Sequence, residues 1–249
     1  MSSITISLIV FACIFGGALL GIFLHAVLPQ HHLSAESKDI VKLGMGLVGT
    51  MAALVLGLLV ASAKGSYDAQ SAELTQMSAN IAVLDRGLAL YGPETKEARA
   101  VLRVAVARIL DQMWSKDGAS PATPSAAGGG ILYEKIAGLS PKNDTQRSLQ
   151  SQALSIAVDI GKTRYLMYAQ QATSVSMPLL VVLVLWLTVI FISFGLFAPF
   201  NGTVVSSLFV SALSVSGAIF LILEMYSPYS GVIAISGAPL QAALAQLGQ

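Results

Sequence analysis

The sequence contains few charged residues and only one cysteine. Asp, Glu, Lys and Arg make up 11% of its 249 residues, whereas 55% are hydrophobic and the mean hydropathy is +0.73. Soluble globular domains carry about 25% charged residues, so the composition argues for an integral membrane protein. The lone cysteine, Cys13, excludes a disulfide or a cysteine metal site within one chain.

Motifs of enzymes and of nucleic-acid-binding proteins are also missing. The sequence has no GxSxG, Walker A, HExxH or CxxC motif, and its net charge of +1 comes without a basic run. Glu73, Asp85 and Arg86 fall in one predicted helix, but Asp85 and Arg86 are neighbours and do not face each other. Ion pairing is the simpler role for them. We therefore expect no enzyme, no catalytic residue, no cofactor and no nucleic-acid partner.

The charges that are present lie mainly in the middle of the chain. Of the fourteen Lys and Arg residues, all but Lys38 and Lys42 lie between Lys64 and Arg164. The first apolar segment has no basic start and no cleavage pattern, so we interpret it as a transmembrane helix and not as a signal peptide. Four apolar segments are long enough to cross about 30 Å of hydrocarbon: residues 4–28, 41–63, 177–198 and 203–223.

The charge distribution predicts both orientation and domain organisation. Because Lys and Arg favour the cytoplasmic side, we expect the polar middle and both termini in the cytoplasm of a multi-pass protein. The predicted fold is an all-α membrane protein with four transmembrane helices and a cytoplasmic helical bundle between the second and third. The predicted parts are transmembrane helices 1 and 2 in 1–63, the cytoplasmic region in 64–175, helices 3 and 4 in 176–225, and an interfacial tail in 226–249.

Apolar residues recur at helical spacing through the polar middle. One such row follows the second span and predicts that its helix continues to about residue 90: Leu74, Met77, Ile81, Leu84, Leu88 and Tyr91. Gly92 and Pro93 are expected to end this helix. Further helices are predicted over 94–114 and 144–174, separated by a flexible loop rich in Pro, Ala, Ser and Gly at 115–130.

The second span carries small residues at every fourth position. In lipid, small residues let helix backbones approach closely, so this strip is predicted to be a helix-packing face: Gly49, Ala53, Gly57, Ala61 and Gly65. A second strip on the same helix is apolar at first and then polar: Met51, Val55, Leu59, Ser62 and Ser66. This second strip either faces lipid or lines a pore with a hydrophobic constriction, and periodicity alone does not choose between them.

The fourth span ends on a carboxylate, Glu224, at about the depth of the membrane interface. A negative charge at the C-terminal end of a helix opposes the helix dipole, so Glu224 is expected to pair with Lys64 or Arg164. Pro228 and Gly231 are predicted to turn the chain into a short tail helix. We expect this tail to lie along the inner face of the membrane.

Three histidines, His25, His31 and His32, lie in or near the loop between the first two spans. Imidazoles bind transition metals, but the spacing here is loose, and a solvated interfacial loop is the simpler interpretation. We therefore assign no metal site.

Two long stretches resemble a family of bacterial membrane proteins described as bestrophin-like: LLVASAKGSYDAQSAELTQMSANIAVLDRGLALYGPE and FGLFAPFNGTVVSSLFVSALSVSGAIFLILEMYSPYSGVIAISGAPLQAALAQLG. The resemblance implies four spans, a location in the bacterial inner membrane, and distant kinship to bestrophin anion channels, which are pentamers with the second helix lining the pore. Bestrophins have bulky aromatic residues at the constriction and an acidic calcium-binding cluster after the last helix. Neither pattern is present here, because Met51, Val55 and Leu59 are slimmer than aromatic residues and Glu224 stands alone.

These observations predict a homo-oligomeric ion channel that conducts small inorganic ions, with the second transmembrane helix lining the pore. The resemblance favours a pentamer as the assembly and an anion as the conducted ion. The alternative is a non-conducting scaffold or sensor whose cytoplasmic helices recruit a partner. A transporter is disfavoured because the sequence has no inverted repeat and no broken mid-membrane helix.

Overall fold

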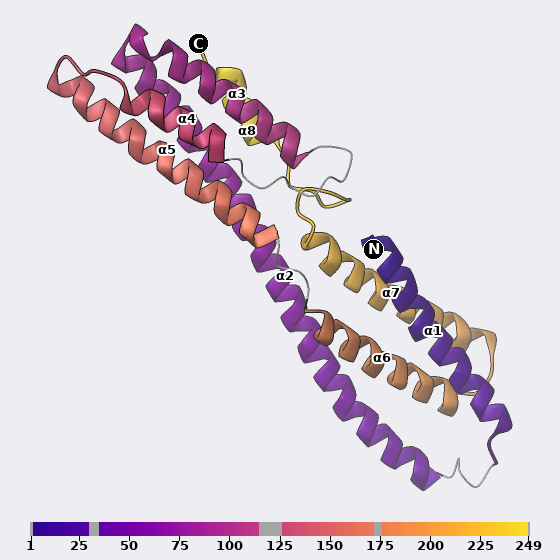
Figure 1. Ribbon diagram of the computed structural model, residues 1–249. Coiled ribbons are helices and arrows are strands. Elements are labelled where there is room, and N and C mark those ends of the chain that lie inside the picture. Colours follow the sequence, from indigo (N-terminus) through magenta and orange to yellow (C-terminus); the bar gives the residue numbers. More distant parts are fainter. Residues whose placement is uncertain (1, 30–34, 115–125, 172–175, 249) are drawn as a thin grey trace. The chain divides into compact units, whose positions relative to one another are not determined.

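The computed structural model describes residues 2–29, 35–114, 126–171 and 176–248. Within these ranges the chain forms eight α-helices and one short 3-10 helix, and no strand (Figure 1). The helices divide between two compact units. We call Met1–Ser66 with Ser174–Tyr226 the membrane unit, and Tyr67–Thr173 with Ser227–Gln249 the helical unit.

Four helices are long and apolar enough to cross a membrane, as the sequence predicted. They are α1 (Ser3–Val27), α2 (Ala35–Tyr91), α6 (Met177–Phe197) and α7 (Gly202–Met225). Capping chemistry agrees with two of the starts, because Ser2 accepts a hydrogen bond from Thr5 N and Asn201 accepts one from Val204 N. The all-helical, four-span part of the prediction is thus confirmed.

Helix α1 packs against α6 and α7, and the approach to α6 is close enough to need glycine. A Cβ on Gly21 would overlap the carbonyl oxygen of Ile192, and a Cβ on Gly195 would overlap that of Ala18. Gly17, one turn before Gly21, lies against Thr188. Small residues four positions apart, such as Gly17 and Gly21, are typical of close helix crossings in membranes. This spacing is visible in the sequence alone.

A buried hydrogen bond joins α1 to α7. The Ser216 hydroxyl donates to the carbonyl oxygen of Ser7 at 2.6 Å, and both residues are buried. Serine in an apolar span is therefore used here to connect two helices. The ring of Phe209 on α7 makes T-shaped contacts with the rings of Phe11 and Phe15 on α1.

The helical unit has its own core. It contains the second part of α2, α3 (Lys96–Met113), α4 (Ala126–Ala137), α5 (Asp144–Gln171) and α8 (Ala238–Gln246), with the 3-10 helix η2 (Pro93–Thr95) between α2 and α3. The apolar row predicted along the first of these helices is buried throughout: Leu74, Met77, Ile81, Leu84, Leu88 and Tyr91. Helix α2 is continuous to Tyr91, and Gly92 follows it with a φ of 136°.

One expectation about this unit is wrong, and another is not decided by its packing. Residues 126–130, expected to belong to a flexible loop, begin α4, which buries Leu132 and Ile136 in the core of the unit. Residues 115–125 of that loop lie outside the described residues. The tail contributes to the same core, because Leu240 and Ala243 of α8 and Leu247 after it are buried there, and its position along the inner face of the membrane stays a prediction.

The tail is fixed to α3 by a hydrogen bond and by ring contacts. Trp114 Nε1 donates to the carbonyl oxygen of Ile235 at 3.0 Å, and the Trp114 ring meets Tyr229 edge to face. Gly237 brings its backbone against the same indole ring. Burial and the nearby Glu73 carboxylate raise the pKa of Tyr229, so its hydroxyl stays neutral.

Candidate functional site

Helix α2 is the most exposed of the four spans. In its most apolar window 11% of the residues are buried, compared with 28–33% in the other three spans. Its exposed face carries large apolar side chains: Leu43, Leu47, Leu54 and Leu58. A membrane helix with so much uncovered apolar surface is suited to contact lipid, a second copy of the chain, or both.

The opposite side of α2 packs into the core of the membrane unit. Ala52, Leu59 and Ala63 are buried there, and Val55 is half-buried against the same core. At the end of the span, the hydroxyls of Ser62 on α2 and Tyr226 after α7 are 3.1 Å apart. This contact joins the end of the α2 span to the end of α7.

The strip of small residues has no packing partner among the described residues of the membrane unit. A Cβ on Gly49, Gly57 or Gly65 would meet no atom within 4 Å, and Ala53 and Ala61 are exposed. The close helix crossing of this unit is instead made by α1 and α6. The strip therefore remains open to a helix from another copy, and its role in packing stays a prediction.

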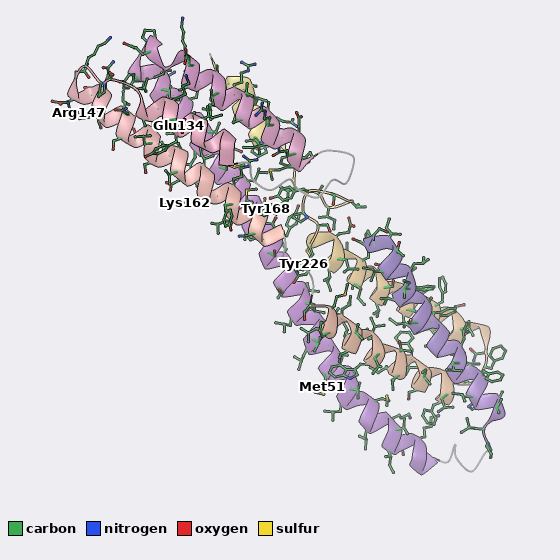
Figure 2. The ribbon with its side chains drawn as sticks, viewed as in Figure 1. Met51, Glu134, Arg147, Lys162, Tyr168 and Tyr226 are labelled. Atoms are coloured by element: carbon green, nitrogen blue, oxygen red, sulfur yellow. The ribbon has the colours of Figure 1, made fainter. Side chains whose placement is uncertain are left out.

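The predicted pore-lining residues occupy different environments within one chain. Met51, labelled in Figure 2, is 47% exposed, Ser62 is exposed, and Val55 and Ser66 are half-buried. Leu59 is only 3% exposed, because it lies on the side of α2 that packs into the core of the unit. Its side chain therefore does not belong to the exposed surface with Met51 and Ser62.

The end of α7 buries the carboxylate that the sequence analysis singled out. Glu224 is 5% exposed. The Ser62–Tyr226 contact places the end of α7 beside the part of α2 that carries Lys64, and pairing of Glu224 with Lys64 stays a prediction. Arg164, the other candidate, donates to Gln112 Oε1 at 2.8 Å within the helical unit, where burial lowers its pKa.

The turn after α7 uses the proline and the glycine that the sequence pointed to. Pro228 is buried, and its carbonyl oxygen accepts a hydrogen bond from Ile235 N at 2.7 Å. Gly231 has a φ of 88°, a conformation that favours glycine. Together they reverse the chain so that α8 meets α3.

Two acidic residues of the helical unit, Asp85 and Glu73, accept hydrogen bonds from side chains of other helices. Asp85 accepts two hydrogen bonds from Arg99, at 2.7 and 2.8 Å, and Glu73 accepts one from Gln170 at 2.8 Å. The hydrogen bonds that Arg99 donates to the Asp85 carboxylate raise the pKa of Arg99. The pairing of Asp85 with Arg99 could not be predicted from neighbouring positions in the sequence, because the two residues lie fourteen residues apart on different helices.

No group of three His, Cys, Asp or Glu side chains in the described ranges could hold a metal ion. His25 is in contact with the end of α6, with its Nδ1 2.7 Å from the carbonyl oxygen of Leu196. His31 and His32 lie outside the described residues. Cys13 is exposed on α1.

A family model described as the bestrophin-like domain matches residues 12–240. The chain belongs to the bestrophin-like family. The resemblance noted in the sequence is thus confirmed, and family membership and the four apolar helices both identify a membrane protein. Neither the curated proteins nor the solved structures give a significant match to this bestrophin-like chain.

Proposed function

We propose that this bestrophin-like protein is a homo-oligomeric ion channel of the bacterial inner membrane, with α2 bordering the conducting path. The observation that carries the proposal is the large uncovered face of α2, the span with the smallest buried share: 11% of its most apolar window, compared with 28–33% in the other three. Kinship to the bestrophins, which are anion channels, supports an anion as the conducted ion and a pentamer as the assembly.

The exposed positions of α2 suggest which side chains border the path. Met51 and Ser62 are eleven residues apart, about three helical turns, and so lie on the same side of the helix. Val55 and Ser66 have the same separation beside them. We propose these four as path-lining, with Met51 and Val55 as the apolar narrow part; Leu59 supports them from the core of the unit.

The proposal also includes the orientation of the protein in the membrane. The concentration of Lys and Arg between Lys64 and Arg164 supports a cytoplasmic helical unit with both termini on the cytoplasmic side. Ser62 and Ser66 then lie at the cytoplasmic end of the path.

Conductance of the purified full chain in planar bilayers tests this function. Met51→Ser should raise single-channel conductance, because a polar side chain eases wetting of an apolar constriction. Leu185→Ser, a matched change at an exposed position of α6, should leave conductance unchanged. In a Cys13→Ser background, Ser62→Cys should react with a water-soluble thiol reagent, and replacing chloride with a large anion should shift the reversal potential.

The alternative is a non-conducting scaffold or sensor. It is favoured by the exposed apolar side chains of α5, where Tyr165 is 64% and Leu166 51% exposed. If wild type and Met51→Ser both fail to conduct and Ser62→Cys does not react, this alternative replaces the channel.

Assembly depends on the strip of small residues in this proposal. Gly57→Leu should reduce the oligomer to smaller species in detergent, because a large side chain would separate backbones of neighbouring copies. Light scattering after size-exclusion chromatography measures the mass of the oligomer in detergent. Gly217→Leu is the matched control, since a Cβ on Gly217 of α7 also meets no atom within 4 Å. An intact oligomer in Gly57→Leu, with Val55→Trp disrupting it, would mean that the packing and path-lining faces are reversed.

A further inference from the structure

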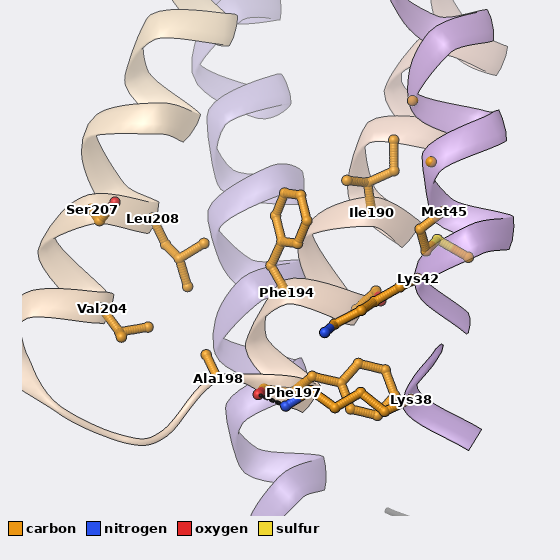
Figure 3. Close-up of a pocket in the computed structure, with 13 residues that line it drawn as sticks. Lys38, Lys42, Met45, Ile190, Phe194, Phe197, Ala198, Val204, Ser207 and Leu208 are labelled. Atoms are coloured by element: carbon orange, nitrogen blue, oxygen red, sulfur yellow. Dashed lines mark hydrogen bonds between the residues drawn. The ribbon is translucent and has the colours of Figure 1, made fainter. Parts of the chain in front are cut away.

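A cavity of about 620 Å³ lies in the membrane unit between the start of α2, the end of α6 and the start of α7 (Figure 3). Lys38 and Lys42, the two basic residues far from the helical unit in sequence, both line it. They lie one helical turn apart on α2. None of the thirteen lining residues is acidic.

The two ammonium groups extend from α2 toward the end of α6 (Figure 3). Lys38 Nζ donates to the carbonyl oxygen of Phe197 at 3.2 Å and lies 5.9 Å from the centre of the Phe197 ring. These contacts hold one charge at the rim and leave it further N–H donors. The ammonium of Lys42 has no partner among the residues that the structure describes.

The rest of the wall is mainly apolar, with Phe194 and two serine side chains, Ser193 and Ser207. Two positive charges in a concave site whose described lining residues include no carboxylate attract an anion. A small hydrated anion would have to lose water against apolar walls. A phosphate diester that carries its own hydrocarbon chains meets both requirements, because the phosphate contacts the lysines and the chains cover the apolar wall.

We propose that this cavity binds an anionic phospholipid, with its phosphate between Lys38 and Lys42 and its chains against α6 and α7. The site lies at the membrane surface opposite to the Lys64 end of α2, where lysine side chains reach the headgroup region. The inference goes beyond ion conduction, and it can fail while the channel proposal stands.

The test uses the purified, delipidated full chain in an uncharged detergent. Dioleoylphosphatidylglycerol is titrated, bound lipid is counted by native mass spectrometry, and the melting temperature is followed. Wild type should retain this lipid in preference to dioleoylphosphatidylcholine and should melt at a higher temperature with it. One lysine-to-glutamine change should weaken binding about fivefold, and Lys38→Gln with Lys42→Gln about thirtyfold.

Two controls separate the cavity from general surface charge. Lys162→Gln, which removes an exposed lysine from α5, should leave retention unchanged. Gly46→Leu keeps both lysines and adds a side chain to a residue of the cavity wall where a Cβ meets no atom within 4 Å, so it should reduce retention.

Equal retention by wild type and the double lysine variant would overturn the proposal, and so would normal retention by Gly46→Leu. Inorganic phosphate at the same concentration distinguishes the source of the anion. If phosphate alone raises the melting temperature of wild type as much as the lipid does, the site takes a soluble anion and the lipid assignment is wrong.

Discussion

Gly21→Ala is expected to destabilise the membrane unit strongly, although alanine favours helix more than glycine does. The added methyl would overlap the carbonyl oxygen of Ile192 and lie 2.9 Å from the backbone nitrogen of Leu196. Backbone atoms cannot rotate away as a side chain can, so α1 and α6 must separate. We expect a loss of about 2–3 kcal/mol or more, seen as a lower melting temperature in detergent.

Gly16→Ala is the matched control on the same helix. A Cβ on Gly16 meets no atom within 4 Å, so the same chemical change should be neutral there. Gly195→Ala should reproduce the effect of Gly21→Ala, because it would overlap the carbonyl oxygen of Ala18 from the other side of the crossing. Equal melting temperatures for Gly16→Ala and Gly21→Ala would show that the two helices are further apart than described.

Asp85→Ala should produce the largest loss of stability among the charged residues of the helical unit. Asp85 is buried, receives two hydrogen bonds from Arg99, and also accepts one from Gly248 N at 3.4 Å. Removing its carboxylate leaves the guanidinium, only one-fifth exposed, without the two hydrogen bonds that it donates to Asp85. The expected cost is about 2–3 kcal/mol, measured by thermal unfolding followed by circular dichroism.

Glu97→Ala provides the comparison. The Glu97 carboxylate also accepts a hydrogen bond from a cation, Lys135 at 2.7 Å, but its side chain is 76% exposed. Water replaces that contact easily, so the melting temperature should hardly change. If both variants lose the same stability, burial does not decide the strength of these pairs.

The spans and the long second helix could be predicted because each depends on local information. Apolar length alone defines α1, α6 and α7, and the row from Leu74 to Tyr91 repeats at helical spacing without a breaker. The ends also carry local signals, such as Gly92 and Pro93 after α2. For these elements, tertiary contacts support what the sequence already favours.

The contacts between helices could not be predicted in the same way. Gly17, Gly21 and Gly195 make the close crossing, whereas the longer glycine and alanine strip of α2 has open space around it. Small residues mark a close approach, but periodicity does not say which neighbour approaches. Leu59 shows the same limit, because a leucine facing lipid, a pore or a core occupies the same position in a helical pattern.

The placement of α8 determines when the core of the helical unit can form during synthesis of the chain. Leu240, Ala243 and Leu247 complete a core that also contains Leu102 and Val106 of α3. More than one hundred residues, including α6 and α7, are synthesised between these two contributions. The last two spans must therefore be synthesised before this core can close. Until then the α3 side chains that α8 covers lack that cover, and the helical unit cannot complete its core.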